Sequence, residues 1–193
     1  MALTTLDPKT ALVVIDLQNA VVALPGTPLT TAQVVARSVE LADAFRAKQL
    51  PVVLVRVDTT PADSLPGRTE RVRPTGGTPP EGAAQIVDAL AGHPEDIVVV
   101  KRNWGAFYGT DLDLHLRRRG ITQVVFTGVA TSIGVESSAR AAYEHGYHVT
   151  LATDAMTDLN PDAHRNSLDW IFPRLGESGT TAEVLELLAK THA

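Results

Sequence analysis

The chain has 193 residues, of which 44% are hydrophobic and 5% aromatic, and it contains no cysteine. This composition is typical of a soluble α/β protein long enough for one sizeable core, so we expect a single domain over residues 1–193. The formal net charge of −5 argues against a nucleic-acid partner, because nucleic-acid-binding surfaces usually have a basic excess. The lack of cysteine excludes disulfide bonds, thiolate nucleophiles and zinc–sulfur sites.

The N-terminal sequence MALTTLDPKT lacks the basic region and apolar core of a secretory signal. No window reaches the roughly 20 consecutive apolar residues that span a bilayer. We therefore expect a cytoplasmic protein with no membrane partner.

Hydrophobic runs and helical periodicities alternate along the chain. In chain order we predict a strand at 10–16, a loop at 17–30, a helix at 31–49, a strand at 51–57, a long loop at 58–82, a helix at 83–91, a strand at 96–101, a helix at 110–119, a strand at 122–127, a helix at 131–145, a strand at 147–152, a helix at 161–173, a short strand at 177–179 and a helix at 182–190. The first strand, TALVVID, is a continuous apolar run of the kind found in parallel strands that are buried on both faces. Strands alternating with helices predict a doubly wound parallel sheet with helices on both sides, a three-layer α-β-α fold.

The predicted loop at 58–82 is rich in proline and carries Arg68, Arg71 and Arg73. A loop of this length inside a compact domain is more often functional than idle. We interpret it as a lid or as an arm that contacts another subunit.

The stretch TQVVFTGVATSIGVESS at 122–138 contains a buried strand, a glycine-interrupted turn and a helix start. Thr131 is the predicted N-cap of that helix. A tight strand-to-helix turn collects backbone N–H groups at the positive end of a helix dipole, which favours an anion or a developing oxyanion. A nucleophile would belong in the first turn of this helix, and the residue there is Gly134.

Three features are predicted to meet at the edge of the sheet. Asp16 ends the first strand, Lys101 ends the third, and the turn at 128–134 follows the fourth. In doubly wound folds ligands bind outside the carboxyl ends of the strands, where the strand order reverses. A carboxylate, an ammonium and an array of N–H donors at this edge would suit an anionic or carbonyl substrate, although buried Asp–Lys pairs also serve purely structural roles.

Three spaced motifs resemble the isochorismatase-like hydrolase superfamily, which also contains nicotinamidases and carbamoyl-amide hydrolases. The motifs are DLQN at 16–19, Lys101 with WGAFYGTDL at 104–112, and GVATSIGVESSAR at 128–140. The resemblance covers nearly the whole chain in order. It implies a six-stranded parallel sheet flanked by helices, a cis peptide bond between Val129 and Ala130, and a homo-oligomer (a dimer or a tetramer).

The sequence departs from the amidases of this superfamily in two places. Their nucleophilic cysteine stands where this chain has Gly134, and a replacement nucleophile such as Ser132 or Ser137 would need its own base. Nicotinamidases also have an Asp/His/His metal cluster after the second strand, whereas this chain has Asp58 and Asp63 but no histidine between residues 50 and 75. We therefore expect no metal and no cofactor.

By resemblance, a glycine at the nucleophile position is what true isochorismatases have. They hydrolyse a vinyl ether and release pyruvate, a reaction that needs a proton donor and water but no covalent nucleophile. The resemblance assigns Asp16 as general acid and Lys101 as the residue that orients it beside Gly134. A lysine about 4 Å away would contribute roughly 4 kcal/mol at an effective dielectric of 20, so we expect an ionised Asp16 in the empty site. An anionic substrate in a dry pocket would raise its pKa.

The candidate substrate-binding residues are Gln18, Trp104, Phe107, Tyr108, Val129, Ala130, Thr131 and Ile133. The aromatic residue usual in the family five positions after the first Asp is Val21 here, and the three aromatic residues of the 104–108 loop are candidates either for stacking on the substrate or for packing. Candidate carboxylate-binding cations are Arg68, Arg71, Arg73 and Arg102.

The leading hypothesis is therefore a metal-free hydrolase acting on an enol ether or a related C–O bond of a small anionic metabolite. Two alternatives stay open: a non-catalytic small-molecule binder, and an amide or ureido hydrolase that uses another nucleophile.

Overall fold

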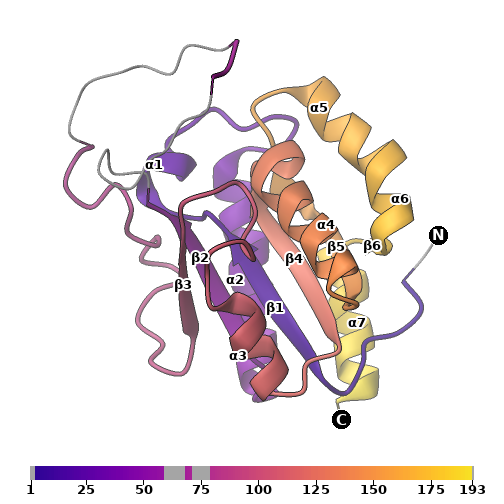
Figure 1. Cartoon of the computed structure of the whole chain (residues 1–193). Helices are drawn as coiled ribbons and strands as arrows, with labels where there is room; N and C mark the ends of the chain where they lie inside the picture. The colour runs from indigo at the N-terminus through magenta and orange to yellow at the C-terminus, as the bar shows by residue number, and fades with distance from the viewer. Residues whose placement is uncertain (1–2, 59–67, 71–78, 193) are drawn as a thin grey trace.

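A parallel β-sheet forms the middle layer of the computed structural model, which describes residues 3–58, 68–70 and 79–192 (Figure 1). The six strands are β1 (Thr10–Ile15), β2 (Val52–Val57), β3 (Ile97–Lys101), β4 (Gln123–Val129), β5 (His148–Thr157) and β6 (Glu177–Gly179). Their order across the sheet is β3-β2-β1-β4-β5-β6, and every neighbouring pair is parallel. The predicted doubly wound, six-stranded parallel sheet is confirmed, and its order reverses between β1 and β4.

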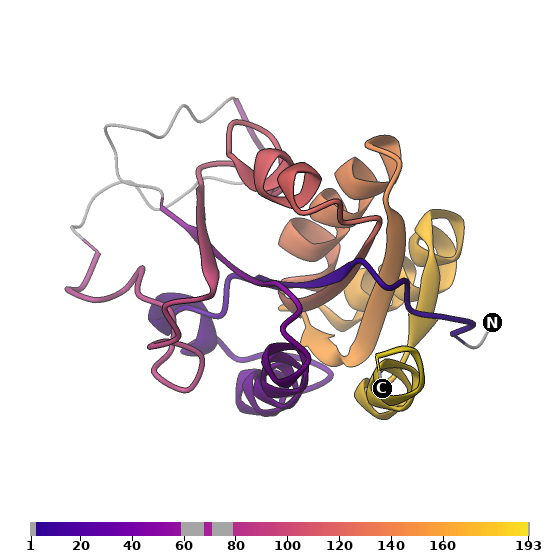
Figure 2. The same ribbon diagram turned by 90° about the horizontal axis from the view of Figure 1, so that it is seen from below.

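Helices cover both faces of this sheet (Figure 2). The helical segments are α1 (Asn19–Val22), α2 (Thr31–Ala47), α3 (Leu112–Arg118), the π-helical turn η1 (Thr131–Val135), α4 (Glu136–Glu144), α5 (Pro161–Asn166), the π-helical turn η2 (Ser167–Ile171), α6 (Phe172–Leu175) and α7 (Thr181–Thr191). Helices α3, α4 and α6 lie on one face, and α2 and α7 lie on the other.

Alternating side chains of the strands supply a separate core for each face. In β1, Val13 and Ile15 pack toward α3 and α4, whereas Leu12 and Val14 pack toward α2 and α7. Because both sets are fully or almost fully buried, the strand reads as one unbroken apolar run.

Side-chain caps define where the longer helices begin. Thr30 and Gln33 form a capping box at the start of α2, and Thr180 and Glu183 form another at α7. These reciprocal bonds satisfy backbone N–H groups that the first turn of a helix leaves unpaired. The two capping boxes therefore fix the first turns of α2 and α7, the two helices that cover one face of the sheet.

The predicted helix at 83–91 is wrong, because this segment forms turns. Its backbone pairs with the segment after β1: Asn19 N–H donates to Gln85 O, Ala20 N–H to Ala83 O, and Val87 N–H to Leu17 O. Tertiary pairing overrides the helix propensity of its alanines.

The helix predicted to start at Thr131 is also altered. Its N-cap position is Ala130, the first turn is π-helical, and the Thr131 hydroxyl bonds to the His164 ring instead of to a backbone N–H. The predicted helix at 161–173 is divided into α5, η2 and α6. Most of the predicted 58–82 loop, including Arg71, Arg73 and Asp63, lies outside the described residues.

Candidate active site

The predicted acid and amine meet at the carboxyl edge of the sheet. Asp16 follows β1, and Lys101 is the last residue of β3, two strands away. The lysine's four-carbon stem reaches across β2, so that its Nζ lies 2.7 Å from Oδ2 of Asp16. Both side chains are buried, with exposed fractions of 2% for Lys101 and 9% for Asp16.

The Lys101 ammonium has three acceptors, one for each of its protons. Besides Asp16 it donates to the backbone carbonyls of Trp104, at 2.9 Å, and Asn103, at 3.2 Å. Its position is therefore fixed by the loop after β3 as well as by the carboxylate.

Burial raises the pKa of Asp16 to about 6, and the neighbouring Lys101 lowers it by a smaller amount. At neutral pH the carboxyl is still mostly ionised, as expected, but the margin is small, because removing the carboxylate from water costs more than the ion pair returns. The second oxygen, Oδ1, is buried and has no hydrogen-bond partner within the part of the chain that the structure describes. Asp16 thus combines a pKa near neutrality with one oxygen that is not committed to the protein.

Gly134 completes this arrangement from the turn after β4. A Cβ atom placed on it would lie 3.3 Å from Oδ2 of Asp16, 3.6 Å from Nζ of Lys101 and 3.0 Å from a methyl carbon of Ile15. Any side chain at position 134 would therefore point at the acid–amine pair. The glycine leaves this space open, and the structure brings together the three residues predicted to be catalytic.

The turn after β4 offers fewer N–H donors than the sequence suggested. Ser132 N–H donates to Oδ2 of Asp158, and the N–H groups of Ile133 and Val135 both donate to Ala130 O. The peptide bond between Val129 and Ala130 is cis, at the position implied by the resemblance. The turn is held mainly by its own bonds, so an anion would meet only part of the expected donor array.

Two residues that the sequence did not single out, Asp158 and His164, brace this turn through Ser132 N–H and the Thr131 hydroxyl. His164 of α5 is buried, and its Nδ1 lies 2.9 Å from the Thr131 hydroxyl. Burial lowers the pKa of His164, although nearby Asp158 opposes the shift. These residues lie about 30 positions away in sequence, and no local motif marks them.

The predicted substrate-binding residues divide into different environments. Phe107 is only 7% exposed and stacks on His145, with ring centroids 5.2 Å apart, so the proposed stacking role for Phe107 is wrong. Trp104 and Tyr108 are 58% and 79% exposed. The Val129 side chain packs into the core beneath α2 and α7.

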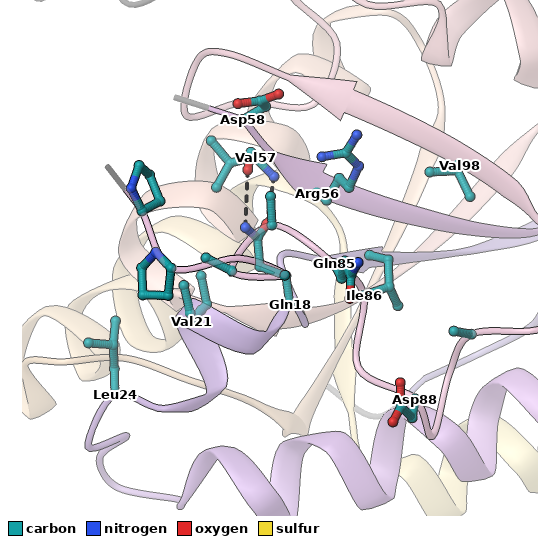
Figure 3. A pocket seen from close by; sticks show the side chains of 17 residues that line it. Gln18, Val21, Leu24, Arg56, Val57, Asp58, Gln85, Ile86, Asp88 and Val98 are labelled. Carbon is teal, nitrogen blue, oxygen red and sulfur yellow. Dashed lines mark hydrogen bonds between the residues drawn. The ribbon is translucent and has the colours of Figure 1, made fainter. Parts of the chain in front are cut away.

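The remaining candidates lie in the segments that follow β1 and β4. The Gln18 side-chain amide donates to Val57 O at 3.0 Å and accepts from Val57 N–H at 2.7 Å (Figure 3). It therefore ties the segment after β1 to the end of β2 and acts as a brace. Ala130 is partly buried, Thr131 is fully buried, and Ile133 is 37% exposed at the surface of the turn.

Two of the four arginines proposed to bind carboxylates are among the described residues. Arg68 and Arg102 are exposed. Across residues 3–58, 68–70 and 79–192, no three His, Asp or Glu side chains are grouped to hold a metal ion. In the same described part of the chain, no helix has the length and apolar composition to cross a membrane.

Comparisons with known proteins agree on one family. The isochorismatase domain model matches residues 10–183. An uncharacterized isochorismatase family protein of Escherichia coli O157:H7, YecD, is 44% identical over 181 residues, covering 93% of this chain and 96% of the relative. A ureidoacrylate amidohydrolase, RutB, of Methylobacterium radiotolerans is 35% identical over 190 residues, covering 84% of this chain and 73% of the relative.

A solved structure shows the same fold. An isochorismatase family protein from Burkholderia thailandensis is 48% identical and superimposes with a TM-score of 0.91, covering 96% of this chain and 98% of that protein. The family model and the solved structure agree with the fold, which places the acid, the amine and the glycine turn at its switch point. The chain belongs to the isochorismatase family of hydrolases.

Proposed function

We propose that this protein hydrolyses an enol ether or a related C–O bond of a small anionic metabolite, without a metal and without a covalent intermediate. Asp16 is the general acid and Lys101 orients it. The observation that carries the proposal is the state of Asp16: its pKa is about 6, and Oδ1 has no hydrogen-bond partner among the described residues. A carboxyl with these properties can hold a proton near neutral pH and deliver it.

The reaction balances with water as the only other reactant. The Asp16 proton goes to the terminal alkene carbon of an enolpyruvyl ether, which leaves an oxocarbenium ion. Water adds to the oxocarbenium carbon, which bears the ether oxygen, and one of its protons returns to the carboxylate. The hemiketal that results collapses to pyruvate and an alcohol. Lys101 stabilises the Asp16 carboxylate once the proton has left.

The charge of the substrate adds to this scheme. At a pKa of about 6, roughly a tenth of the Asp16 carboxyls are protonated at pH 7 in the free enzyme. A negative charge bound close to Asp16 raises its pKa further, because like charges disfavour ionisation. An anionic enol ether such as isochorismate therefore increases the protonated fraction of its own catalyst.

Covalent catalysis has less support. The chain has no cysteine, and a thiol is absent at Gly134. Ser132 and Ser137 make no side-chain hydrogen bond to a histidine or carboxylate among the described residues, so neither has the adjacent base that a serine nucleophile needs.

A test uses isochorismate as substrate and follows pyruvate release with lactate dehydrogenase. We expect turnover by the wild-type protein, a loss of at least about a hundredfold in Asp16→Asn, and no change in the matched surface variant Asp162→Asn. Absence of wild-type turnover contradicts the proposed substrate class, and full activity of Asp16→Asn contradicts the assigned acid.

A second candidate follows from the similarity to the ureidoacrylate amidohydrolase of Methylobacterium radiotolerans. Ammonia release from ureidoacrylate, together with a covalent adduct on a serine detected by intact mass, would favour an amide or ureido hydrolase. A non-catalytic binder would show a thermal shift with anionic metabolites and no product.

A further inference from the structure

Two loops frame the acid–amine pair, and the sheet does not pair them with each other. The loop after β3 supplies the carbonyls of Asn103 and Trp104 that hold the Lys101 ammonium. The turn after β4 contains Gly134. In the sheet order β2 and β1 lie between β3 and β4, so the strand ladders alone do not fix one loop against the other.

The hydroxyl of Ser138 joins these two loops. Ser138 lies in the first turn of α4 and is fully buried. Its Oγ donates to Gly134 O at 2.6 Å and accepts from Ala106 N–H, in the loop after β3, at 3.0 Å. The first of these bonds uses the only proton of the hydroxyl, and the second uses one of its lone pairs. Because Ser138 and Ala106 are both fully buried, water does not compete for the bond between them.

The bond at Ala106 lies close to the lysine along the chain. Ala106 is two residues from Trp104, whose carbonyl oxygen lies 2.9 Å from Nζ of Lys101. The Thr110 hydroxyl donates to Ala106 O, so both backbone groups of Ala106 are hydrogen-bonded. A displacement of Ala106 would therefore pass directly to an acceptor of the Lys101 ammonium.

A local role in the helix explains only half of this arrangement. Serine hydroxyls inside helices commonly bond to the carbonyl four residues earlier, and the bond to Gly134 O has that form. The bond from Ala106 N–H comes from a different loop, 32 residues away in sequence. The second bond makes Ser138 a link between the two sides of the candidate active site.

We propose that Ser138 is a positioning residue, which holds the Lys101 ammonium in register with the open space at Gly134. The role rests on the proposed function, because Ser138 is buried and acts only through Lys101 and Gly134. Substrate in that space must meet Asp16 and Lys101 in one geometry, and small misplacements of reacting groups cost rate.

Ser38 of α2 provides a matched control. It is also fully buried, and its hydroxyl donates to the Thr127 hydroxyl at 3.0 Å. Helix α2 covers the opposite face of the sheet from α4. Ser38→Ala therefore removes a buried serine hydroxyl and its bond without touching either loop around the acid–amine pair.

The first measurement does not require turnover. It is the ¹H–¹⁵N NMR signal of the Lys101 side-chain ammonium at pH 6 and low temperature, identified by its loss in Lys101→Met. A buried ammonium with three acceptors exchanges its protons slowly with water, and loosening of its acceptors speeds exchange. We expect the signal in the wild-type protein and in Ser38→Ala, and its broadening or loss in Ser138→Ala.

The second measurement is pyruvate release from isochorismate. We expect Ser138→Ala to lower kcat about tenfold with KM changed by less than about twofold, because the substrate contacts remain and the alignment is lost. Ser38→Ala should keep the wild-type kcat. Ser138→Cys, which has a similar shape but bonds weakly, should show the changes of the alanine variant to a smaller extent, and it serves for both measurements if Ser138→Ala does not fold.

Two results overturn the proposal. One is a wild-type ammonium signal in the Ser138 variants. The other is an equal loss of that signal in Ser38→Ala, since the effect would then follow from stability alone. If the wild-type protein releases no pyruvate, the proposed function fails, and the ammonium signal still decides whether Ser138 positions Lys101.

Discussion

The pH dependence of the reaction tests the central role of Asp16. If the protonated carboxyl is the catalyst, kcat/KM follows its protonated fraction in the free enzyme. With a pKa of about 6, that fraction is a half at pH 6, about a tenth at pH 7 and about a hundredth at pH 8. We therefore expect kcat/KM for enol-ether hydrolysis to fall roughly fiftyfold between pH 6 and pH 8.

The pH profile of kcat should be displaced from that of kcat/KM toward higher pH. A bound anion raises the pKa of Asp16, so the falling limb of kcat should lie at higher pH than the limb of kcat/KM. The assay is initial-rate pyruvate release at saturating and limiting substrate, with far-UV circular dichroism at each pH to verify that the protein stays folded. A neutral enol ether would lack this separation between the two limbs.

The opposite slope would refute the reasoning. An amidase that uses ionised Asp16 as a base would gain activity as the pH rises through 6, because the carboxylate would then be the active form. A kcat/KM that is flat or rising between pH 6 and pH 8 would therefore exclude Asp16 as the acid, even if the protein turns over the substrate.

Three further variants test other parts of the structure. Lys101→Met removes the cation 2.7 Å from Asp16, so the falling limb of kcat/KM should move up by more than about one pH unit. Asp96→Ala removes the buried carboxylate 2.6 Å from Arg46, which keeps only the exposed Asp43 and the Leu90 carbonyl as acceptors, and should lower the free energy of unfolding in urea by about 2 kcal/mol. For His164 burial holds the folded pKa below the ordinary histidine value of about 6.5, so the folded protein loses stability as the pH falls from 6.5 through that lower pKa. His164→Asn should lose less stability across this window, measured as the change in Tm.

A matched control tests the Asp96→Ala result, and a contradicting outcome can be stated for each of the three variants. Asp162→Ala breaks the exposed pair with Arg165 and should change the unfolding free energy by less than about 1 kcal/mol. An equal effect of Asp96→Ala and Asp162→Ala would contradict the importance of burial. An unmoved limb in Lys101→Met would show that the ion pair does not set the acidity of Asp16, and unchanged pH sensitivity in His164→Asn would show that another group titrates.

The sequence predicted the sheet and the central pair because both follow from simple regularities. Buried parallel strands are continuous β-branched runs, and the carboxyl ends of such strands meet at one edge. Asp16 and Lys101 could therefore be placed together before their side chains were visible. The turn that contains Gly134 was placed at the same edge by the same argument, and the resemblance then singled out Gly134 within it.

The errors arose where tertiary contacts override local preference. The 83–91 segment has helical composition, but its backbone pairs with residues after β1. Phe107 belongs to an aromatic loop, yet it packs against His145 and Tyr147 instead of facing a ligand. His164 was missed because its partner Thr131 is distant in sequence. The raised pKa of Asp16 depends on burial depth, which no pairwise charge argument supplies.

Asp16 has a backbone φ of 54°, in the left-handed region that most residues avoid. Aspartate and asparagine tolerate this conformation better than other residues with a side chain, and glycine adopts it freely. Replacement by alanine would therefore combine loss of the carboxyl with a backbone penalty on the order of 1 kcal/mol, and a measured defect could not be attributed to chemistry alone. The same constraint limits which residues can replace Asp16 in a relative that lacks the proton donor. Only asparagine and glycine would adopt this φ with little conformational cost.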